Sequence, residues 1–224
     1  MKTFHQIQEG VYDPNILKAF FLAGGPGSGK SYVVQRTTGG MGMRIVNSDV
    51  QFEKKLKDAG LSTDLRELDP TTRDEIRARA KEITKKQKAN YVEGRLGLII
   101  DGTGKDFDKI KNQSTRLKQL GYDVHMIFVN TSLDVALENN QRRARTLKDS
   151  IVKDSWNQVQ KNMGKFQRYF GGANFIIVDN NEVDKDGRLF DACFKRVKGL
   201  LSKKVNNPQA KRWIEREIAV RKGR

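Results

Sequence analysis

The chain has 224 residues, and its 37% hydrophobic and 31% charged residues indicate one compact domain with a core beneath a strongly charged surface. A single cysteine, Cys193, excludes an internal disulfide and any cysteine-rich metal site, and the two histidines argue against structural zinc. No stretch approaches the roughly 18 consecutive apolar residues of a membrane span, and the amino terminus carries no apolar run of the signal-peptide type. The expected compartment is therefore the cytoplasm, with no membrane partner.

Positive charge is concentrated in two parts of the chain. The formal net charge is +16, residues 188–224 hold 12 Lys and Arg against 3 Asp and Glu, and residues 141–168 hold 8 against 2. A field of this kind attracts polyanions and accelerates their encounter with the protein, which favours a nucleic-acid partner. The alternative is a set of solvated surface lysines and arginines, and composition alone does not separate the two.

Short apolar runs alternate along the chain with longer polar segments of helical character. The runs predicted as buried strands are 19–23, 43–47, 96–100, 124–129 and 175–178. Helices are predicted over 30–36, from 48 onward, over 71–94 and 107–120, after 132, over 148–169 and 189–201, and after 208. Strands that alternate with helices form a parallel sheet covered on both faces, so we expect an α/β fold of three layers.

The first predicted strand is followed by Gly24-Gly25-Pro26-Gly27-Ser28-Gly29-Lys30-Ser31, which fits the pattern G-x-x-x-x-G-K-[S/T]. Glycines let the backbone turn tightly and aim successive N–H groups at phosphate oxygens, and the following helix adds the positive end of its dipole. Lys30 is expected to reach the β- and γ-phosphates, and Ser31 to offer its hydroxyl to Mg²⁺. The sequence therefore predicts a site for ATP and Mg²⁺. The residues assigned to the nucleotide in this loop are Gly25, Gly27, Ser28, Gly29, Lys30 and Ser31.

GTPases, motor ATPases and small kinases share this loop, and the residues at the strand ends distinguish them. Asp101-Gly102-Thr103-Gly104 fits the D-x-x-G half of a GTPase signature, but Asn130-Thr131-Ser132-Leu133 lacks the lysine and the aspartate of the N-K-x-D half. Asp101 is followed by glycine, so the adjacent acids with which motor ATPases hold Mg²⁺ and activate water are missing. The small-kinase arrangement is the class that remains.

Four segments, 21–31, 45–49, 98–103 and 129–152, together resemble the polynucleotide 5′-kinase and zeta-toxin group of P-loop kinases. The resemblance spans most of residues 19–178. With the order of elements, it implies a three-layer P-loop NTPase fold of the nucleotide-kinase type, with a parallel five-stranded sheet, an extra long helix and a basic carboxy-terminal helix. We expect a kinase domain over 1–205, with a lid at about 141–150, followed by the basic helix over 206–224.

In this group an aspartate after the second strand takes the proton from the acceptor hydroxyl, and the matching residue is Asp49. The position suits that role because parallel sheets bind ligands at the carboxyl ends of their strands, where a carboxylate can orient a hydroxyl for in-line attack. The alternative is that Ser48 or Asp49 only caps the following helix. Asp101 is expected to hold Mg²⁺ or to contact the substrate. Phe52 stands where both families usually carry an arginine, so their acceptor specificity cannot be carried over.

The run from 139 to 147 resembles the arginine-bearing lid of these kinases. A guanidinium group stabilises charge on a transferring phosphoryl group, and its planar fork suits phosphate better than an ammonium does. Arg142 and Arg145 lie three positions apart and share a helix face if the preceding helix continues through them, so both are assigned to catalysis. Arg143 is assigned to nucleotide binding. The alternative for each arginine is a solvated position at a helix end.

The sequence leaves three functions open, and they differ in the phosphoryl acceptor. A polynucleotide kinase would phosphorylate the 5′-hydroxyl of DNA or RNA, with the basic tail and the helix over 71–94 following the phosphate backbone. A zeta-toxin-like kinase would phosphorylate a nucleotide-sugar or another small metabolite, which needs no basic tail. A nucleic-acid-binding accessory protein would use its ATP site structurally. Charge favours the first, and Trp156 and Trp213 are candidate stacking platforms, although packing is the commoner role of tryptophan.

Overall fold

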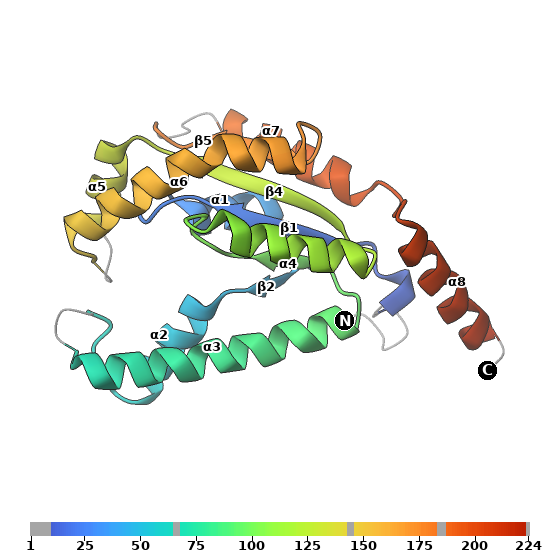
Figure 1. The fold of residues 1–224 in the computed structure, drawn as a ribbon, viewed down its shortest axis with the longest axis horizontal. Coiled ribbons are helices and arrows are strands. Elements are labelled where there is room, and N and C mark those ends of the chain that lie inside the picture. Colours follow the sequence, from blue (N-terminus) through green and yellow to red (C-terminus); the bar gives the residue numbers. More distant parts are fainter. Residues whose placement is uncertain (1–9, 65–67, 143–145, 183–186, 223–224) are drawn as a thin grey trace.

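The computed structural model of the chain describes residues 10–64, 68–142, 146–182 and 187–222. A central sheet carries helices on both faces (Figure 1). Its five strands have the order β2-β3-β1-β4-β5, and every neighbouring pair is parallel. The strands are β1 (Lys18–Ala23), β2 (Arg44–Val46), β3 (Leu98–Ile100), β4 (Asp123–Asn130) and β5 (Phe175–Asp179). The predicted three-layer α/β fold with a parallel five-stranded sheet is confirmed.

Eight α-helices lie among the described residues, and a short 3₁₀ turn, η2 (Gly10–Tyr12), precedes β1. The helices are α1 (Lys30–Thr38), α2 (Ser48–Asp58), α3 (Pro70–Glu93), α4 (Phe107–Gln119), α5 (Leu133–Gln141), α6 (Asp149–Phe170), α7 (Arg188–Leu201) and α8 (Pro208–Lys222). Side-chain caps begin several of them, as expected for helix starts with orphan N–H groups: Ser132 accepts from the N–H of Val135, and Asp106 from that of Lys109.

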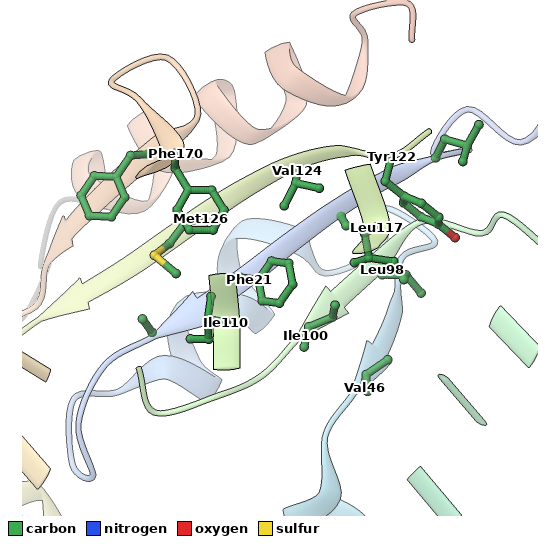
Figure 2. Packing of buried hydrophobic residues seen from close by; sticks show 14 of the residues in the cluster. Phe21, Val46, Leu98, Ile100, Ile110, Leu117, Tyr122, Val124, Met126 and Phe170 are labelled. Atoms are coloured by element: carbon green, nitrogen blue, oxygen red, sulfur yellow. The ribbon is translucent and has the colours of Figure 1, made fainter. Parts of the chain in front are cut away.

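The side chains of β1 alternate between two hydrophobic cores, one on each face of the sheet. Phe21 packs in the first core with Leu117 of α4 and Phe170 of α6, and Figure 2 shows these three side chains around the strands. Phe20 packs in the second core with Val197 of α7 and residues of α1. Because all six residues of β1 are buried, this strand is the centre of the molecule.

The helices α2 and α3 form an arm with a small core of its own. Phe52 and Leu56 of α2 are buried against Ala80 of α3, and Figure 1 shows α3 running as one long helix beside β2. At its far end, Tyr91 and Val92 pack on the first main core. The arm is therefore fixed at both ends of α3, and the middle of this helix is left to border the carboxyl end of the sheet.

The basic helix α8 also packs on the first main core. Ala210 is fully buried, and Trp213, Ile214 and Ile218 are partly buried against the same cluster. Gly121 (φ 101°) is needed here, because a Cβ at this position would lie 2.9 Å from the backbone nitrogen of Ala210. The helix is thus held by apolar contacts, while its charged side chains remain at the surface.

Lys18 and His125 are buried polar side chains at the amino end of the sheet. Lys18 is 2% exposed, and its Nζ donates to Asp123 Oδ2 at 2.7 Å. His125 is 5% exposed, and its ring lies 4.8 Å from that of Phe20. Burial lowers the pKa of His125 from 6.5 to about 4, with a further lowering by the charge of Lys18. The imidazole is therefore neutral near neutral pH.

We predict that His125 makes the protein less stable in acid. Between pH 6.5 and about 4 the unfolded chain takes up a proton on this residue that the folded chain does not, so the free energy of unfolding falls as the pH falls, by up to about 1.4 kcal/mol per pH unit. The charged groups near the ring are Lys18, Asp123 and Lys203. Urea denaturation at about pH 7 and about pH 5 should give a smaller loss for His125→Phe than for the wild type. Equal losses would contradict the prediction.

Candidate active site

The phosphate loop lies between β1 and α1, at the carboxyl end of the sheet. The N–H of Gly24 donates to Thr103 O at 2.9 Å, which ties the start of the loop to the segment after β3. Gly27 and Gly29 have φ values of 77° and 82°, in the left-handed region that favours glycine. A Cβ at Gly27 would also collide with the carbonyl group of Ala136 in α5. Both the conformation of the loop and its packing therefore require glycine here.

Two asparagines hold the loop from outside. Asn139 Nδ2 of α5 donates to Gly27 O at 2.9 Å, and Asn180 Nδ2, from the segment after β5, donates to Ser28 O at 3.0 Å. Sequence reasoning missed both residues. Asn180 had a positional signal, because it follows a strand of a parallel sheet, whereas nothing in the local sequence of Asn139 connects it with a loop 112 positions away.

The interior of the loop presents groups suited to phosphate. Lys30 Nζ donates to Gly24 O at 2.6 Å and to Gly25 O at 3.1 Å, so its ammonium group is held against the loop. Ser28 is 1% exposed, and its hydroxyl has no hydrogen-bond partner among the described residues. Helix α1 begins without a side-chain cap, so the N–H groups of its first turn can donate to an anion. A buried hydroxyl without a partner and an uncapped helix start fit phosphate oxygens.

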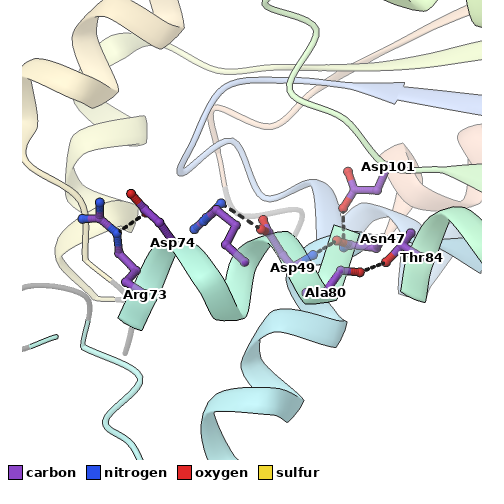
Figure 3. Close-up of polar contacts among 8 residues, drawn as sticks. Asn47, Asp49, Arg73, Asp74, Ala80, Thr84 and Asp101 are labelled. Atoms are coloured by element: carbon purple, nitrogen blue, oxygen red, sulfur yellow. Dashed lines mark hydrogen bonds and ion pairs between the residues drawn. The ribbon is translucent and has the colours of Figure 1, made fainter. Parts of the chain in front are cut away.

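Asn47 joins the two acids that the sequence singled out. Its Nδ2 donates to Asp101 Oδ2 at 2.7 Å, and its Oδ1 accepts from the backbone N–H of Asp49 at 2.7 Å (Figure 3). Asn47 is therefore the N-cap of α2, and the alternative that Ser48 or Asp49 caps this helix is wrong. Asn47 thus links the Asp101 carboxylate to the backbone of Asp49, and not to its side chain, near the ends of two adjacent strands. Asn47 itself was not predicted, because its role depends on β2 and β3 being neighbours.

A guanidinium group from α3 lies beside Asp49. Arg77 Nη1 is 3.9 Å from Asp49 Oδ1, and the Asp49 side chain is 47% exposed. The guanidinium carbon of Arg77 lies 4.5 Å from the ring centroid of Phe52, a cation–π contact. A cation from α3 thus covers Phe52, the position where an arginine was expected. Arg77 was missed because it reaches Asp49 only through the packing of α3 against α2.

A cavity of about 520 Å³ lies between the carboxyl end of β3 and the helices α3 and α4. Ser48, Thr84 and Asp101 contribute to its wall. Five lysines also line it: Lys81, Lys85, Lys88, Lys105 and Lys109. Burial, and then the charges of Lys109 and Arg116, lower the pKa of Lys88. The cavity therefore concentrates positive charge where at least one ammonium group is partly desolvated.

A second cavity, of about 310 Å³, lies on the other side of Asp101. Its walls include Ser31 of the phosphate loop, Asn47 and Asp101, together with apolar residues of α1 and β2. Asp49 lines neither cavity, although its chain neighbours Ser48 and Val50 line the larger and the smaller one respectively. Ser31 and Asp101, the two residues predicted to hold Mg²⁺, thus line one cavity. Within the described ranges, no three His, Cys, Asp or Glu side chains gather into a metal site.

The predicted lid is described only in part. Helix α5 ends at Gln141, and Arg142 is its C-cap, paired with Glu138 one turn earlier. The condition for a shared helix face, that the helix continues through Arg142 and Arg145, is therefore not met at Arg142. The buried Asn140 provides the physical reason, since its side chain exchanges two hydrogen bonds with the backbone of Leu147 and draws the chain back. Arg143 and Arg145 lie outside the described residues.

The two tryptophans have packing roles. Trp156 Nε1 donates to Thr131 O at 2.8 Å, and its backbone lies behind the phosphate loop, where a Cβ at Gly25 would be 3.6 Å from Trp156 Cα. Trp213 packs on the first main core, with the Arg95 guanidinium 5.7 Å from its ring centroid. The structure thus supports the alternative of packing over that of base stacking.

The loop between β1 and α1, the parallel order of the strands and the acids at their carboxyl ends define a P-loop kinase fold. The model of the zeta toxin family matches residues 6–185. The chain belongs to the zeta toxin family. No curated protein sequence matches the chain, and no helix among the residues described is long and apolar enough to cross a bilayer.

Solved structures support the fold. A putative kinase from Chloroflexus aurantiacus J-10-fl has a TM-score of 0.57 at 16% identity, covering 81% of this chain and 97% of that one. A chain of the Pnkp1/Rnl/Hen1 RNA repair complex has a TM-score of 0.52 at 17% identity, covering 73% and 49%. A chain of the PezAT toxin–antitoxin system of Streptococcus pneumoniae has a TM-score of 0.50 at 14% identity, covering 83% and 88%. Sequence identities this low establish that the chains share a fold and nothing further.

We predict that Gly27→Ala abolishes the phosphate-binding form of the loop. The added Cβ meets Ala136 and a left-handed backbone, so the affinity for ATP should fall about tenfold or more, as measured by calorimetric titration. Gly164→Ala is the matched control, since a Cβ there meets nothing within 4 Å. It should keep the affinity and stabilise α6 by up to about 1 kcal/mol. Equal affinities of the two variants would contradict the prediction.

Proposed function

We propose that the chain transfers the γ-phosphate of ATP to a hydroxyl group of an anionic acceptor, and that the acceptor is the 5′-end of a polynucleotide. The observation that carries this proposal is the cavity of about 520 Å³, in which five lysines surround Ser48 and Asp101. Phosphoryl transfer to an acceptor that itself bears phosphate needs compensation of negative charge beside the reacting groups. A basic cavity lined by Asp101 and by Ser48, the neighbour of Asp49, meets that need.

The phosphate loop binds the nucleotide. Its backbone N–H groups at Gly25, Gly27 and Gly29 and the hydroxyl of Ser28 donate to phosphate oxygens, and Lys30 carries the charge for the β- and γ-phosphates. We assign Mg²⁺ to the Ser31 hydroxyl and the Asp101 carboxylate, both oxygen donors of the kind that this ion prefers. When bound, Mg²⁺ supplies charge neutralisation at the phosphates. The wall of the smaller cavity, which both residues share, supports this assignment.

Asp49 is the general base. It stands in the first turn of α2, where the N–H bond to Asn47 fixes its backbone and Arg77 at 3.9 Å restrains its carboxylate. There it accepts the proton of the acceptor hydroxyl, whose oxygen attacks the γ-phosphorus as the bond to the β-phosphate oxygen breaks. The proton thus moves to Asp49, and ADP leaves with the electron pair of the broken bond.

The lid supplies guanidinium groups to the transferred phosphoryl group. We assign Arg142 and Arg145 to this charge and Arg143 to the nucleotide, in keeping with the preference of phosphate for the planar fork of arginine. Arg142 would have to exchange its partner Glu138 for phosphate, which costs little because its side chain is 71% exposed.

A polynucleotide acceptor is favoured over a nucleotide-sugar by the distribution of charge. Lysines of the cavity suit phosphate in either ligand, but the basic residues beyond it, on α3 and α8, have a role only for a longer polyanion. One structural neighbour belongs to an RNA repair complex. The alternatives are a kinase of a nucleotide-sugar or other small metabolite, and an accessory protein that binds nucleic acid and uses ATP structurally.

Asp49→Asn should abolish transfer but leave the nucleotide site intact. Loss of the general base should lower kcat about a hundredfold or more, with little change in the affinity for ATP. The measurement uses γ-labelled ATP and Mg²⁺ with 5′-hydroxyl oligonucleotides, UDP-sugars and nucleosides offered in parallel. Asp58→Asn, at the exposed end of the same helix, is the matched control and should keep the wild-type rate.

Each result of this assay separates the candidate functions. Label in oligonucleotides alone supports the proposal, and label in UDP-sugars alone supports the small-metabolite kinase. Absence of label from every acceptor, with retained binding of ATP, would favour the accessory protein. A wild-type rate for Asp49→Asn would overturn the assignment of the base.

We predict that Lys88→Met weakens binding of the acceptor without lowering the stability of the protein. Burial and two nearby cations disfavour the charged form of Lys88, which offsets the loss of its hydrogen bond of 2.8 Å to Gln113 Oε1, so an apolar side chain of similar length should leave the Tm nearly unchanged. The same change removes a charged donor to the acceptor and should raise its KM on the order of tenfold. Lys86→Met, on the exposed face of α3, should leave the KM unchanged. A fall in Tm with an unchanged KM would assign Lys88 a structural role instead.

A further inference from the structure

A third cavity, of about 560 Å³, lies at the amino end of the sheet, opposite to the phosphate loop. It opens between the starts of β1 and β4, the end of α4 and the segment that joins α7 to α8. The polar residues that line it are Lys18, Lys118, Asp123, His125, Asn174, Lys203, Lys204, Asn206 and Asn207. Because β1 has six residues, the two ends of the sheet are roughly 20 Å apart. The cavity is therefore separate from the site proposed for catalysis.

His125 supplies the first sign that the cavity binds a ligand. The side chain is 5% exposed, and neither ring nitrogen makes a hydrogen bond of normal geometry among the residues described. The Asn174 side chain is near enough to act as a hydrogen-bond partner of one ring nitrogen, which still leaves the other nitrogen without a partner. A buried polar group without a partner is costly unless a ligand or water satisfies it. The neutral imidazole can offer one N–H donor at this wall.

Of the four lysines that line the cavity, Lys203 and Lys204 supply positive charge that no described acid compensates. Lys18 is paired with Asp123 at 2.7 Å, and the ammonium group of Lys118 lies 4.5 Å from the ring centroid of Tyr169. Lys203 and Lys204 are exposed and have no ion pair with any residue that the structure describes. The cavity therefore combines a neutral buried donor with two ammonium groups, a set that suits a phosphate group.

The surface around the cavity indicates a polymer rather than a single ion. Asn206, at its edge, accepts from Lys211 Nζ of α8 at 2.8 Å. Beyond Lys211, the exposed face of this helix carries Arg212 and Arg216. Apolar contacts with the core fix the position of α8, which begins at the residue after Asn207 in the wall of the cavity. A single phosphate ion would use the cavity alone, whereas a polynucleotide can engage both the cavity and the helix.

We propose that this cavity binds a backbone phosphate of a nucleic-acid strand, whose neighbouring phosphates follow the basic face of α8. The donors are His125, Lys203 and Lys204, and the strand binds through charge and not through its base sequence. This inference goes beyond the phosphotransfer proposed above and does not depend on it, because binding here requires neither ATP nor an acceptor hydroxyl.

The test uses the full chain without ATP and a fluorescent single-stranded 12-mer that already carries a 5′-phosphate. Fluorescence anisotropy is followed over a range of salt concentrations. Lys203→Gln/Lys204→Gln should weaken binding on the order of tenfold and reduce the slope of log K against log salt by about 1.4, which is the loss expected for two contacts to a single strand. Lys54→Gln/Lys57→Gln, which removes two exposed lysines of α2, is the control of equal charge and should bind more tightly than the cavity variant.

A second variant and a second ligand sharpen the test. His125→Phe retains an aromatic ring beside Phe20 and removes both nitrogens, so it should weaken binding of the 12-mer several-fold with a Tm at or above the wild-type value. Inorganic phosphate should compete only weakly. Equal affinity and equal salt slope for the cavity variant and its α2 control would overturn the proposal. Competition by inorganic phosphate as strong as that by unlabelled 12-mer would overturn the assignment to a polymer.

Because the oligonucleotide has no acceptor hydroxyl at its 5′-end, these results are independent of the phosphotransfer assay. Loss of transfer with retained, cavity-dependent binding would overturn the proposed function alone. Phosphotransfer by the wild type, together with unchanged oligonucleotide binding by the Lys203, Lys204 and His125 variants, would overturn only the proposed phosphate-binding role of this cavity.

Discussion

Burial of β1 on both faces is the constraint on which the rest of the structure depends. Phe20 and Phe21 enter different cores, so helices must cover both sides of this strand, and β3 and β4 must flank it in parallel. Parallel strands end at the same edge of a sheet. The loop after β1, Asp101 after β3 and Asn180 after β5 therefore meet at one edge, and the hydrophobic effect assembles a polar site without any apolar residue taking part in its chemistry.

Side-chain hydrogen bonds and an ion pair then fix the positions of the polar residues that packing brings near one another. Asn47 connects the N-terminus of α2 with the end of β3 through two bonds of 2.7 Å, so Asp49 and Asp101 keep a fixed relation. Arg77 adds a cation from the arm, lying over Phe52 and beside Asp49. A cation therefore remains next to the acid although the neighbouring position in the sequence is apolar. The chain thus retains this local charge through a contact between two helices.

Concentrated positive charge destabilises the folded chain and favours the binding of anionic ligands. Lys88 is partly desolvated among other cations, and His125 is buried without a hydrogen-bond partner of normal geometry. Such groups destabilise a fold that binds nothing. Each lines a basic cavity, one at either end of the sheet, which is the distribution expected of a protein that engages a polyanion in more than one place.

The sequence by itself determined the features that depend on local physics. The glycine spacing from 24 to 31 specifies a phosphate loop, because backbone dihedrals and helix starts are local properties, and the apolar runs predicted all five strands for the same reason. The end of α5 before Arg142 escaped prediction, since it depends on the contact of Asn140 with Leu147. Only the tertiary structure decided that Asn47 bridges the acids, that Arg77 stands over Phe52, and that His125 faces a cavity. These are contacts between residues distant in sequence, and they exist because the strands assemble in the order β2-β3-β1-β4-β5 with helices packed against them, an outcome of long-range burial that no local pattern encodes.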